Sequence, residues 1–247
     1  MMNKMFDMHC HIIPDVDDGS KSLDESLAML AEERRQGVTD IILTPHLRIG
    51  MFETPRDRVE EHFNYLRHAA REHCPEMNLY LGCEFHSNMD MTEMLRSDPR
   101  YRMIGTDFVL LEFSGAHSGE YIKERTYSLI ARGYRPIIAH CERYRPVFTS
   151  IRFAGELVDM GAELQVNADT VTGRDGFSMK RFASKLMKEG LLSYVGSDAH
   201  NTRDRATHIG EARAYIERKA GESYARRLFE KNPQRIVDLS CGNKEVF

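Results

Sequence analysis

Near its N-terminus the chain reads Phe6-Asp7-Met8-His9-Cys10-His11, a short apolar segment that runs into a His-x-His pair. Side chains alternate between the two faces of a β-strand, so a strand over residues 5–9 would point His9 and His11 the same way at its end. Two imidazoles on one face suit a divalent first-row metal ion, although such an ion needs further ligands from elsewhere in the chain. The later stretch Val195-Gly196-Ser197-Asp198-Ala199-His200 repeats the pattern, with an acid and a histidine two residues apart.

The composition is that of a globular protein. With 247 residues, 41% of them hydrophobic, the chain can form one closed core, and we expect a single domain over residues 1–247. A net charge of −4 provides no polycationic face, which argues against a nucleic-acid partner. No apolar run approaches the ~18 residues of a membrane span, and no secretory leader is recognisable, so we expect a cytoplasmic protein without membrane insertion. The odd number of cysteines, with no C-x-x-C pair, indicates neither a disulfide framework nor a cysteine zinc site.

Strand and helix patterns alternate along the chain. The expected strands are 5–9, 40–43, 79–85, 108–113, 136–140, 162–167 and 192–197. Such alternation means parallel strands joined by right-handed crossovers. Seven units predict an α/β fold, a distorted (β/α)7 TIM-like barrel with one unit fewer than the (β/α)8 barrel. Two helices, 205–219 and 223–230, are expected after the last strand.

In barrels of this kind the active site lies at the carboxyl ends of the strands. Ligand-type side chains of this chain fall there at six strand ends, and Asp18, in the acidic loop that follows the first strand, adds one more. The candidate metal ligands are His9, His11, Asp18, His46, Glu84, Glu112, His140, Asp198 and His200. One buried histidine is more often an ordinary core residue. Recurrence at six strand ends favours a common metal centre.

The number and type of these candidates indicate the chemistry. Five imidazoles and four carboxylates are too many for a site with two or four ligands, whereas three metal ions that share a bridging carboxylate would use them all. Nitrogen and oxygen donors without thiolate suit Mn, Fe or Zn. Three divalent ions and four carboxylates leave a charge of about +2, which favours a dianionic phosphate monoester. Clustered metals lower the pKa of bound water toward ~7 and generate hydroxide, so we expect hydrolytic phosphoryl transfer.

Three arginines lie on the same expected rim. Arg48, Arg143 and Arg205 each follow a candidate histidine ligand within five residues. A guanidinium can grip phosphate oxygens in a fork geometry, although for each arginine alone a surface ion pair is as good an interpretation.

Two other phosphatase or hydrolase mechanisms lack their sequence patterns. A cysteine-nucleophile phosphatase requires an arginine six residues after the cysteine, and no cysteine has one; Cys141, for example, is followed by Val147. A Ser-His-Asp hydrolase of the Gly-x-Ser-x-Gly type is also unsupported, because that pentapeptide is absent.

Taken together, these segments resemble the PHP (polymerase and histidinol phosphatase) superfamily, most closely the metal-dependent bacterial protein-tyrosine phosphatases of capsule and exopolysaccharide operons. The segments that carry the resemblance are 7–11 with 15–19, 44–46 with 50–54, 82–84, 111–113, 138–144, 165–167 and 197–201. They occur in order over the whole chain, which makes the likeness specific. It implies the PHP fold, a distorted seven-stranded barrel with a trinuclear metal site.

The resemblance also implies which residues share each metal ion, with manganese as the first choice and Glu84 as a bridge. The implied sets are His9, His11, Glu84 and Asp198 for one ion; Glu84, Glu112 and His140 for a second; and Asp18, His46 and His200 for the third. Arg143 and Arg205 match the family's phosphate-binding arginines. With Asp198 they make up the expected catalytic residues.

The implied substrate is phosphotyrosine on a bacterial tyrosine kinase that controls capsule or exopolysaccharide synthesis. Substrate contacts are expected from Arg48, Arg143, Arg205 and Tyr144. Met51, Phe52 and Tyr144 are candidates to wall the aryl ring, with ordinary loop packing as the alternative.

Two alternative functions stay open on the same fold. One is a histidinol-phosphate or other small phosphomonoester phosphatase, and the other is an inactive metal-binding scaffold. Glu112 favours the tyrosine-phosphatase branch, because many small-molecule phosphatases of the superfamily have histidine there. Leu47-Arg48 departs from the more basic pair that often follows the second-strand histidine. Exposed Leu and Met side chains on the first helix are compatible with a homo-oligomer.

Overall fold

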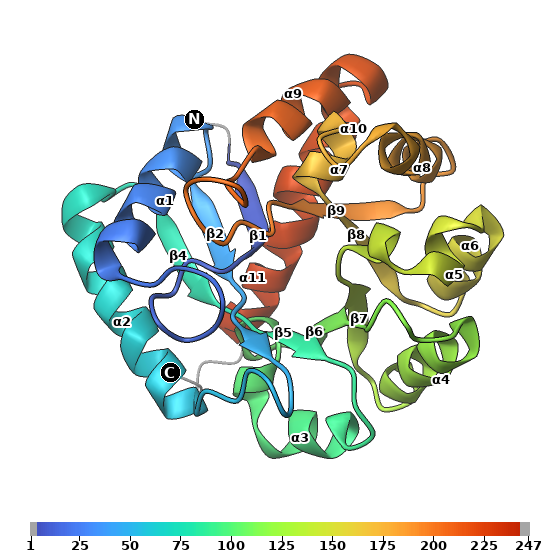
Figure 1. The fold of residues 1–247 in the computed structure, drawn as a ribbon, viewed down its shortest axis with the longest axis horizontal. Coiled ribbons are helices and arrows are strands. Elements are labelled where there is room, and N and C mark those ends of the chain that lie inside the picture. Colours follow the sequence, from blue (N-terminus) through green and yellow to red (C-terminus); the bar gives the residue numbers. More distant parts are fainter. Residues whose placement is uncertain (1–3, 243–247) are drawn as a thin grey trace.

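Parallel strands surrounded by helices make up the structure, a computed structural model that describes residues 4–242 (Figure 1). One sheet has the order β1-β2-β4, formed by β1 (Phe6–Cys10), β2 (Asp40–Leu43) and β4 (Asn78–Leu81). The other has the order β3-β5-β6-β7-β8-β9, formed by β3 (His46–Leu47), β5 (Glu84–His86), β6 (Phe108–Glu112), β7 (Arg135–Ile138), β8 (Glu163–Asn167) and β9 (Leu192–Gly196). Every paired strand runs parallel to its neighbour.

The two sheets represent seven strand positions, because β2 leads into β3 and β4 leads into β5 after short interruptions. The sequence predicts one unbroken strand over 79–85, whereas the structure breaks it at Gly82. A β-carbon at Gly82 would lie 3.1 Å from the side chains of Ile42 and Met103, so the backbone there passes closer to its neighbours than a regular strand. Between β2 and β3, Pro45 has no N–H to offer a sheet.

The carboxyl ends of the first strand, β1, and the last strand, β9, are also joined by backbone hydrogen bonds. Asp198 N donates to His9 O and His11 N donates to Ala199 O, each over 2.8 Å. The seven strand positions therefore follow one another around the molecule, and the predicted (β/α)7 barrel is confirmed.

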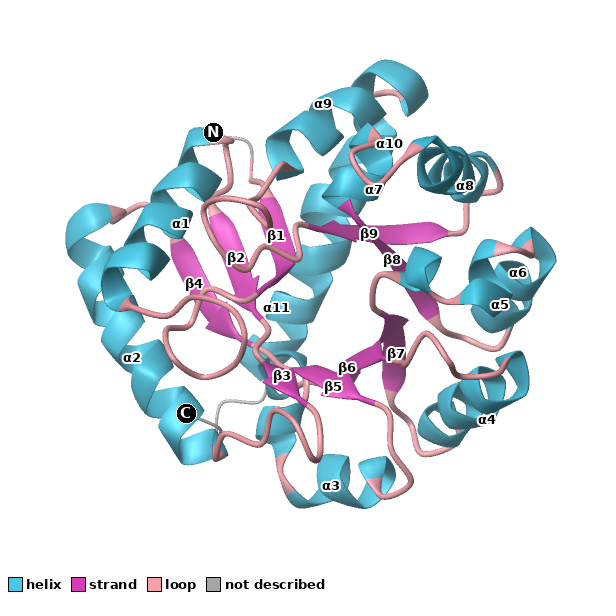
Figure 2. Cartoon of the chain, viewed as in Figure 1, coloured by secondary structure: helices cyan, strands magenta, loops and turns pink. Residues whose placement is uncertain are grey.

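Helices cover the outside of the strands (Figure 2). Their bounds are α1 (Leu23–Arg35), α2 (Arg56–His73), α3 (Met91–Ser97), α4 (Gly119–Ile130), α5 (Arg145–Phe148), α6 (Ile151–Asp159), α7 (Ala168–Thr172), α8 (Phe177–Lys188), α9 (Ile209–Ala220), α10 (Glu222–Arg226) and α11 (Asn232–Gly242). Ser22 caps α1 by accepting from Glu25 N, the contact typical of a capping box. Within residues 4–242, none of these helices is both long and apolar enough to cross a membrane.

The C-terminal helices differ from the sequence prediction. The helix expected from residue 205 begins at Ile209, because residues 201–208 form a loop in which Asn201 Oδ1 accepts from Arg205 N over 3.1 Å. The sequence predicts no helix after 223–230, but α11 starts at Asn232-Pro233. Proline is tolerated in the first turn of a helix, where its missing N–H has no helical partner.

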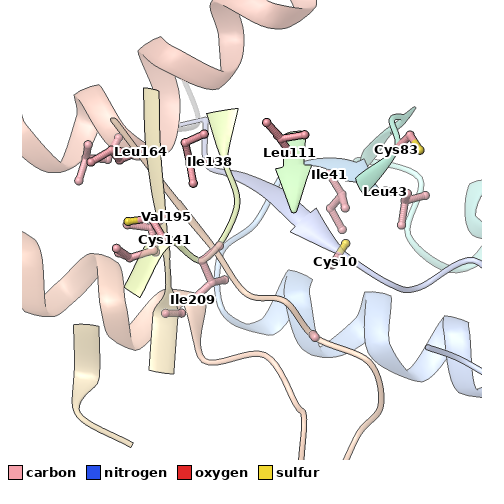
Figure 3. Packing of buried hydrophobic residues seen from close by; sticks show 14 of the residues in the cluster. Cys10, Ile41, Leu43, Cys83, Leu111, Ile138, Cys141, Leu164, Val195 and Ile209 are labelled. Atoms are coloured by element: carbon pink, nitrogen blue, oxygen red, sulfur yellow. The ribbon is translucent and has the colours of Figure 1, made fainter. Parts of the chain in front are cut away.

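Buried apolar side chains form two groups. The larger group lies between the strands and the helices and includes Leu111, Ile138, Leu164 and Val195 (Figure 3). The smaller group fills one end of the barrel interior, and we call it the barrel floor. It consists of Met8, Ile42, Met103, Phe108, Leu110, Ile137, Ala139, Tyr194 and Ile236. Because Ile236 belongs to α11, the unpredicted last helix closes this end of the barrel.

An irregularity in β1 sets the direction of the His-x-His pair. Met8 packs in the barrel floor whereas Cys10 packs in the outer group, although residues two apart normally share a face. The pairing of β1 with β2 shifts register between Asp7 and Cys10, which is the signature of a β-bulge. His9 and His11 consequently both face the interior, above Met8.

Candidate metal centre

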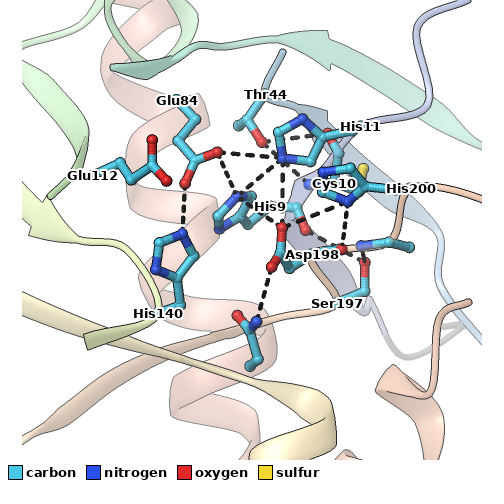
Figure 4. A network of polar contacts seen from close by, with 12 residues as sticks. His9, Cys10, His11, Thr44, Glu84, Glu112, His140, Ser197, Asp198 and His200 are labelled. Atoms are coloured by element: carbon cyan, nitrogen blue, oxygen red, sulfur yellow. Dashed lines mark hydrogen bonds and ion pairs between the residues drawn. The ribbon is translucent and has the colours of Figure 1, made fainter. Parts of the chain in front are cut away.

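The predicted ligands converge at the open end of the barrel interior, opposite the floor; Figure 4 shows how all of them except Asp18 and His46 lie. Most of them are buried, His46 and Glu112 are partly exposed, and Asp18 is the most accessible. Donor atoms that lie within 4.8 Å of one another form three groups that share members. These are His9, His11 and Glu84; His46, Glu84 and Glu112; and His11, Asp18, His46 and His200.

The first group surrounds a point between β1, β5 and β9. The Nε2 atoms of His9 and His11 are 3.4 Å apart, and each lies 3.3 Å from Glu84 Oε2. Asp198 Oδ1 lies 3.6 Å from His9 Nε2 and 3.5 Å from His11 Nε2. Most of these separations exceed an N–H···O hydrogen bond and are close to the roughly 3.0–3.4 Å between two donors that share one ion at about 2.1 Å.

Glu84 connects the first group to the second. Its Oε1 lies 2.8 Å from His140 Nε2, and its Oε2 lies 2.8 Å from His46 Nδ1. Glu112 Oε2 is 3.9 Å from the same His46 nitrogen. Because both oxygens of Glu84 face histidine nitrogens on different sides, this carboxylate has the position that a bridge between two cations requires.

The third group lies nearest the surface. Asp18 Oδ1 is 3.4 Å from His46 Nε2 and 3.5 Å from His200 Nε2. The rings of His11 and His200 are stacked with centroids 3.9 Å apart. His200 Nδ1 donates to the carbonyl of Asp198 over 2.8 Å, which leaves Nε2 without its proton and directed to Asp18.

Asp17, to which the sequence analysis gave no role, holds two of the histidines. Its Oδ2 accepts from His46 N over 2.9 Å and lies 2.8 Å from His11 Nδ1. Because burial is outweighed by these contacts, chiefly with His11, the pKa of Asp17 falls to about 2. An ionised carboxylate only accepts, so His11 carries its proton on Nδ1 and presents the Nε2 lone pair to the centre. The sequence Asp17-Asp18-Gly19 is typical of a turn in which the first aspartate accepts from the glycine N–H, as Asp17 Oδ1 does from Gly19 N. This pattern is the sequence signal that could have indicated the role of Asp17.

Burial and neighbouring charges shift the pKa values of several side chains in the centre. Burial and the Glu84 carboxylate raise the pKa of Glu112 to about 7. Burial and His11 lower the pKa of His200 to about 4. Burial alone would raise the pKa of Glu84, but the imidazoles of His9 and His46 hold it well below its usual range. The carboxylates and imidazoles of the site therefore perturb one another strongly, as is typical of a dense cluster of ionisable side chains at a functional site.

Several buried donor atoms at the centre have no hydrogen-bond partner. Among residues 4–242, these include Glu84 Oε2, Glu112 Oε2 and His200 Nε2. Buried polar atoms are normally paired, so unpaired lone pairs that converge at one place indicate a binding site for cations. A set of nitrogen and oxygen donors with these spacings fits divalent metal ions.

Two of the predicted arginines border the centre. Arg143 Nη2 lies 2.7 Å from Asp198 Oδ2. Arg205 Nη1 lies 3.2 Å from Asp18 Oδ2, and its Nη2 lies 3.7 Å from Asp198 Oδ1. Both guanidinium side chains stay partly exposed, so they can face a ligand that enters from solvent.

The other predicted substrate contacts occupy different environments. Arg48 starts a tight loop in which its N–H donates to Phe52 O, and the ring of Phe52 stacks on His46 with centroids 5.0 Å apart. Met51, at the tip of this loop, is exposed. Tyr144 is only 1% exposed, and its hydroxyl accepts from Phe113 N and lies 3.1 Å from His140 Nδ1.

Two of the candidate ligands have backbone conformations that residues other than glycine rarely adopt. His140 has a φ of 28° and Asp198 a φ of 55°. Such residues cost about 1–3 kcal/mol each and persist where surrounding contacts impose them. Here His140 N donates to Gln165 Oε1 over 2.6 Å and Asp198 N donates to His9 O.

Comparison with known protein families assigns the chain to a known group. A family model for capsular polysaccharide synthesis, CpsB/CapC, matches residues 5–238. The tyrosine-protein phosphatase CpsB of Streptococcus pneumoniae is 36% identical over 238 residues, which cover 94% of this chain and 98% of that protein. The tyrosine-protein phosphatase YwqE of Bacillus subtilis is 31% identical over 244 residues, covering 98% of this chain and 94% of that protein.

Solved structures give the same grouping. A crystal structure from work on YwqE of Bacillus subtilis and CpsB of Streptococcus pneumoniae, described as unique metal-dependent tyrosine phosphatases, superposes with a TM-score of 0.85 at 29% identity. It covers 98% of this chain, which covers 96% of that chain. Histidinol phosphate phosphatase from Lactococcus lactis shares the fold alone, with a TM-score of 0.58 at 16% identity over 88% of this chain and 94% of that one.

Proposed function

The chain belongs to the CpsB/CapC capsular polysaccharide synthesis family, and we propose that it is a protein-tyrosine phosphatase that works with three divalent metal ions, manganese foremost. It is a metal-dependent phosphoric monoester hydrolase, with the whole barrel as its one catalytic domain. The observation that carries the proposal is the convergence of three overlapping donor groups, two of which share Glu84, with unpaired buried lone pairs among their members.

The proposed ligand sets are those that the family resemblance implies, and the three donor groups supply most of their members. The first ion would be held by His9, His11, Glu84 and Asp198; the second by Glu84, Glu112 and His140; and the third by Asp18, His46 and His200. When bound, such ions polarise phosphoryl oxygens and lower the pKa of coordinated water. Asp17 keeps the Nε2 atom of His11 free to coordinate.

The arginines at the rim would bind the phosphoryl group. Arg143 and Arg205 already contact carboxylates, so a phosphate can accept from their remaining N–H groups in the same fork geometry. Arg48 supplies a third positive charge on the neighbouring loop. Because Tyr144 is buried against His140, we propose that it orients the His140 ring and does not contact the substrate. Met51 and Phe52 then remain the candidates for contact with the aryl group.

Phosphotyrosine suits a site of this kind. A phenol leaves with a pKa of about 10, well below that of an aliphatic alcohol, so the reaction depends less on a strong general acid. We propose that the substrate is a bacterial tyrosine kinase of capsule or exopolysaccharide synthesis, which is consistent with the family description. We expect the reaction in the cytoplasm, where an ATP-dependent kinase forms phosphotyrosine.

The proposal is tested with the purified protein loaded with Mn²⁺. We expect a higher kcat/KM for a phosphotyrosine peptide than for histidinol phosphate or for the same peptide with phosphoserine. Preference for histidinol phosphate would make the protein a small-molecule phosphatase. Failure to hydrolyse any aryl phosphate with Mn²⁺, Fe²⁺ or Zn²⁺ would leave a metal-binding scaffold.

A cysteine variant tests the metal mechanism separately. Cys141 is fully buried, and burial raises the pKa of its thiol well above the usual range, so it supplies no thiolate nucleophile. Cys141→Ser should keep most of the activity. A Cys141→Ser protein that binds its metals but hydrolyses nothing would contradict the mechanism.

A further inference from the structure

Two side-chain amides on β8 connect three of the proposed ligands. The backbone N–H of His140 donates to Gln165 Oε1 over 2.6 Å, and Gln165 Nε2 donates to Asn167 Oδ1 over 3.0 Å. Asn167 Nδ2 in turn donates to Asp198 Oδ2 over 2.9 Å. Gln165 and Asn167 are both buried, and we call them the amide chain.

The amide chain has a fixed direction. Oxygen and nitrogen of a side-chain amide have nearly the same shape, but a backbone N–H can only donate, so the Gln165 atom facing His140 must be the oxygen. The nitrogen of Gln165 then faces Asn167, which must turn its own oxygen toward it. This leaves the Asn167 nitrogen for the carboxylate of Asp198. Each orientation follows from the one before.

The same oxygen of Gln165 also faces His9. It lies 3.2 Å from His9 Nδ1, and because a carbonyl oxygen only accepts, His9 must carry its proton on Nδ1. The Nε2 lone pair is then directed to the centre, where Glu84 Oε2 lies 3.3 Å away. A neutral imidazole with this tautomer is the form that coordinates a metal through Nε2.

We propose that Gln165 is a positioning residue that sets the tautomer of His9 and, through Asn167, fixes which oxygen of Asp198 is turned to the metal centre. The proposal rests on the proposed function, because these orientations matter only if His9 and Asp198 are ligands. Gln165 thereby orients two ligands of the same ion. Its Oε1 accepts from His9, and its Nε2 donates to Asn167, which holds Asp198. Gly196 allows this arrangement, since a β-carbon there would lie 3.2 Å from Gln165 Nε2 and 2.6 Å from His9 Cβ.

The first test measures the His9 tautomer in the metal-free protein. The ring nitrogens of His9 are followed by ¹⁵N NMR at alkaline pH, where the ring is neutral, in wild type and in Gln165→Met, which keeps the length of the side chain but removes both polar groups. We expect an Nδ1-protonated ring in wild type and a mixture of both tautomers in Gln165→Met. An unchanged tautomer in a folded variant would overturn the proposal.

Gln36→Met is the matched control. Gln36 also makes hydrogen bonds with both ends of its amide, to Thr207 O over 2.7 Å and from Gly210 N over 2.9 Å, but it lies outside the centre. It should leave the His9 signals and the metal affinity unchanged, while thermal unfolding reports the general cost of a lost amide.

The second test measures Mn²⁺ affinity by competition with a chelator. Gln165→Met should bind the metal about 10- to 100-fold more weakly. Asn167→Leu should also weaken binding, and the double variant should lose less than the product of the two single effects, because Asn167 already lacks its partner in Gln165→Met. Multiplicative losses would show independent roles and would overturn the coupling.

Gln165→Glu separates the two branches. Its carboxylate still accepts from His140 N and His9 Nδ1, but it presents an oxygen in place of the donor to Asn167. We expect the wild-type tautomer of His9 with weakened metal affinity, and wild-type affinity in this variant would contradict the role of Asn167. If the wild-type protein failed to hydrolyse phosphotyrosine, the proposed function would fall, whereas the tautomer result would stand or fall on its own.

Discussion

The two ends of the barrel interior are built from the same strands but have opposite chemistry. Along β6, Phe108 and Leu110 lie in the barrel floor, and Glu112 follows on the same face at the metal centre. The floor is apolar, tightly covered by α11, and contains no candidate ligand, whereas the other end holds unpaired lone pairs. The comparison indicates that the first half of each strand stabilises the fold and the last residues carry the chemistry.

The largest expected effect comes from the bridge. Glu84→Gln keeps the shape of the side chain but removes the charge shared by two donor groups. We expect kcat/KM for a phosphotyrosine peptide to fall by at least about 10⁴-fold, which corresponds to roughly 5 kcal/mol of transition-state stabilisation. Steady-state kinetics at saturating Mn²⁺ measure it, and a variant with more than a tenth of wild-type activity would remove Glu84 from the mechanism.

A floor variant should show the reverse pattern. Leu110→Ala removes a fully buried side chain from the barrel floor and should lower the free energy of unfolding by about 2–5 kcal/mol. Urea denaturation measures the loss. In the folded fraction, kcat should stay within a factor of about three of wild type. A collapse of kcat with little loss of stability would show that floor and centre are not separable.

The thermal stabilisation that Mn²⁺ provides should also distinguish a variant of the metal centre from a variant of the barrel floor, although this effect is smaller than the two above. A ligand present at 100 times its Kd stabilises the folded state by about 2.7 kcal/mol. We therefore expect Mn²⁺ to raise the melting temperature of wild type and Leu110→Ala alike, and a chelator to reverse the shift. Glu84→Gln should shift much less in the same thermal scans. Equal shifts in all three proteins would mean that Mn²⁺ binds elsewhere.

The smallest expected effect lies at the rim. Arg143→Ala should raise KM about tenfold, because one charge-assisted contact to the phosphate is lost. Metal content, measured by elemental analysis, should change little, since the guanidinium contacts Asp198 Oδ2 and not the oxygen nearest His9 and His11. Parallel loss of metal and of substrate affinity would give Arg143 a structural role instead.

The sequence predicts the convergence of the ligands because the ends of parallel strands share one edge of a barrel. Glu112 and His140, which are distant in sequence, needed only the period of two and the alternation of strands and helices to be placed together. The fold class could be predicted for the same reason. Local interruptions such as Gly82 could not, because they depend on how closely neighbouring strands approach.

The roles of residues that act through other residues could not be predicted in this way, even where their segment, such as 165–167, carries the family resemblance. Gln165 and Asn167 are uncharged amides in an ordinary strand, and only their hydrogen bonds reveal a direction. Asp17 and Asp18 are adjacent acids in one loop, and the turn geometry alone decides which of them holds His11. The burial of Tyr144 likewise depends on the packing of Phe113, which no pattern of residue types encodes.

The meeting of β1 with β9 has a consequence for synthesis on the ribosome. His9 is synthesised long before Asp198, yet the backbone of one bonds to the backbone of the other. A nascent chain that ends before β9 lacks both Asp198 and the partner strand that orients β1. Complete assembly of the cation-binding cluster therefore has to wait until β9 and the residues that follow it have left the ribosome.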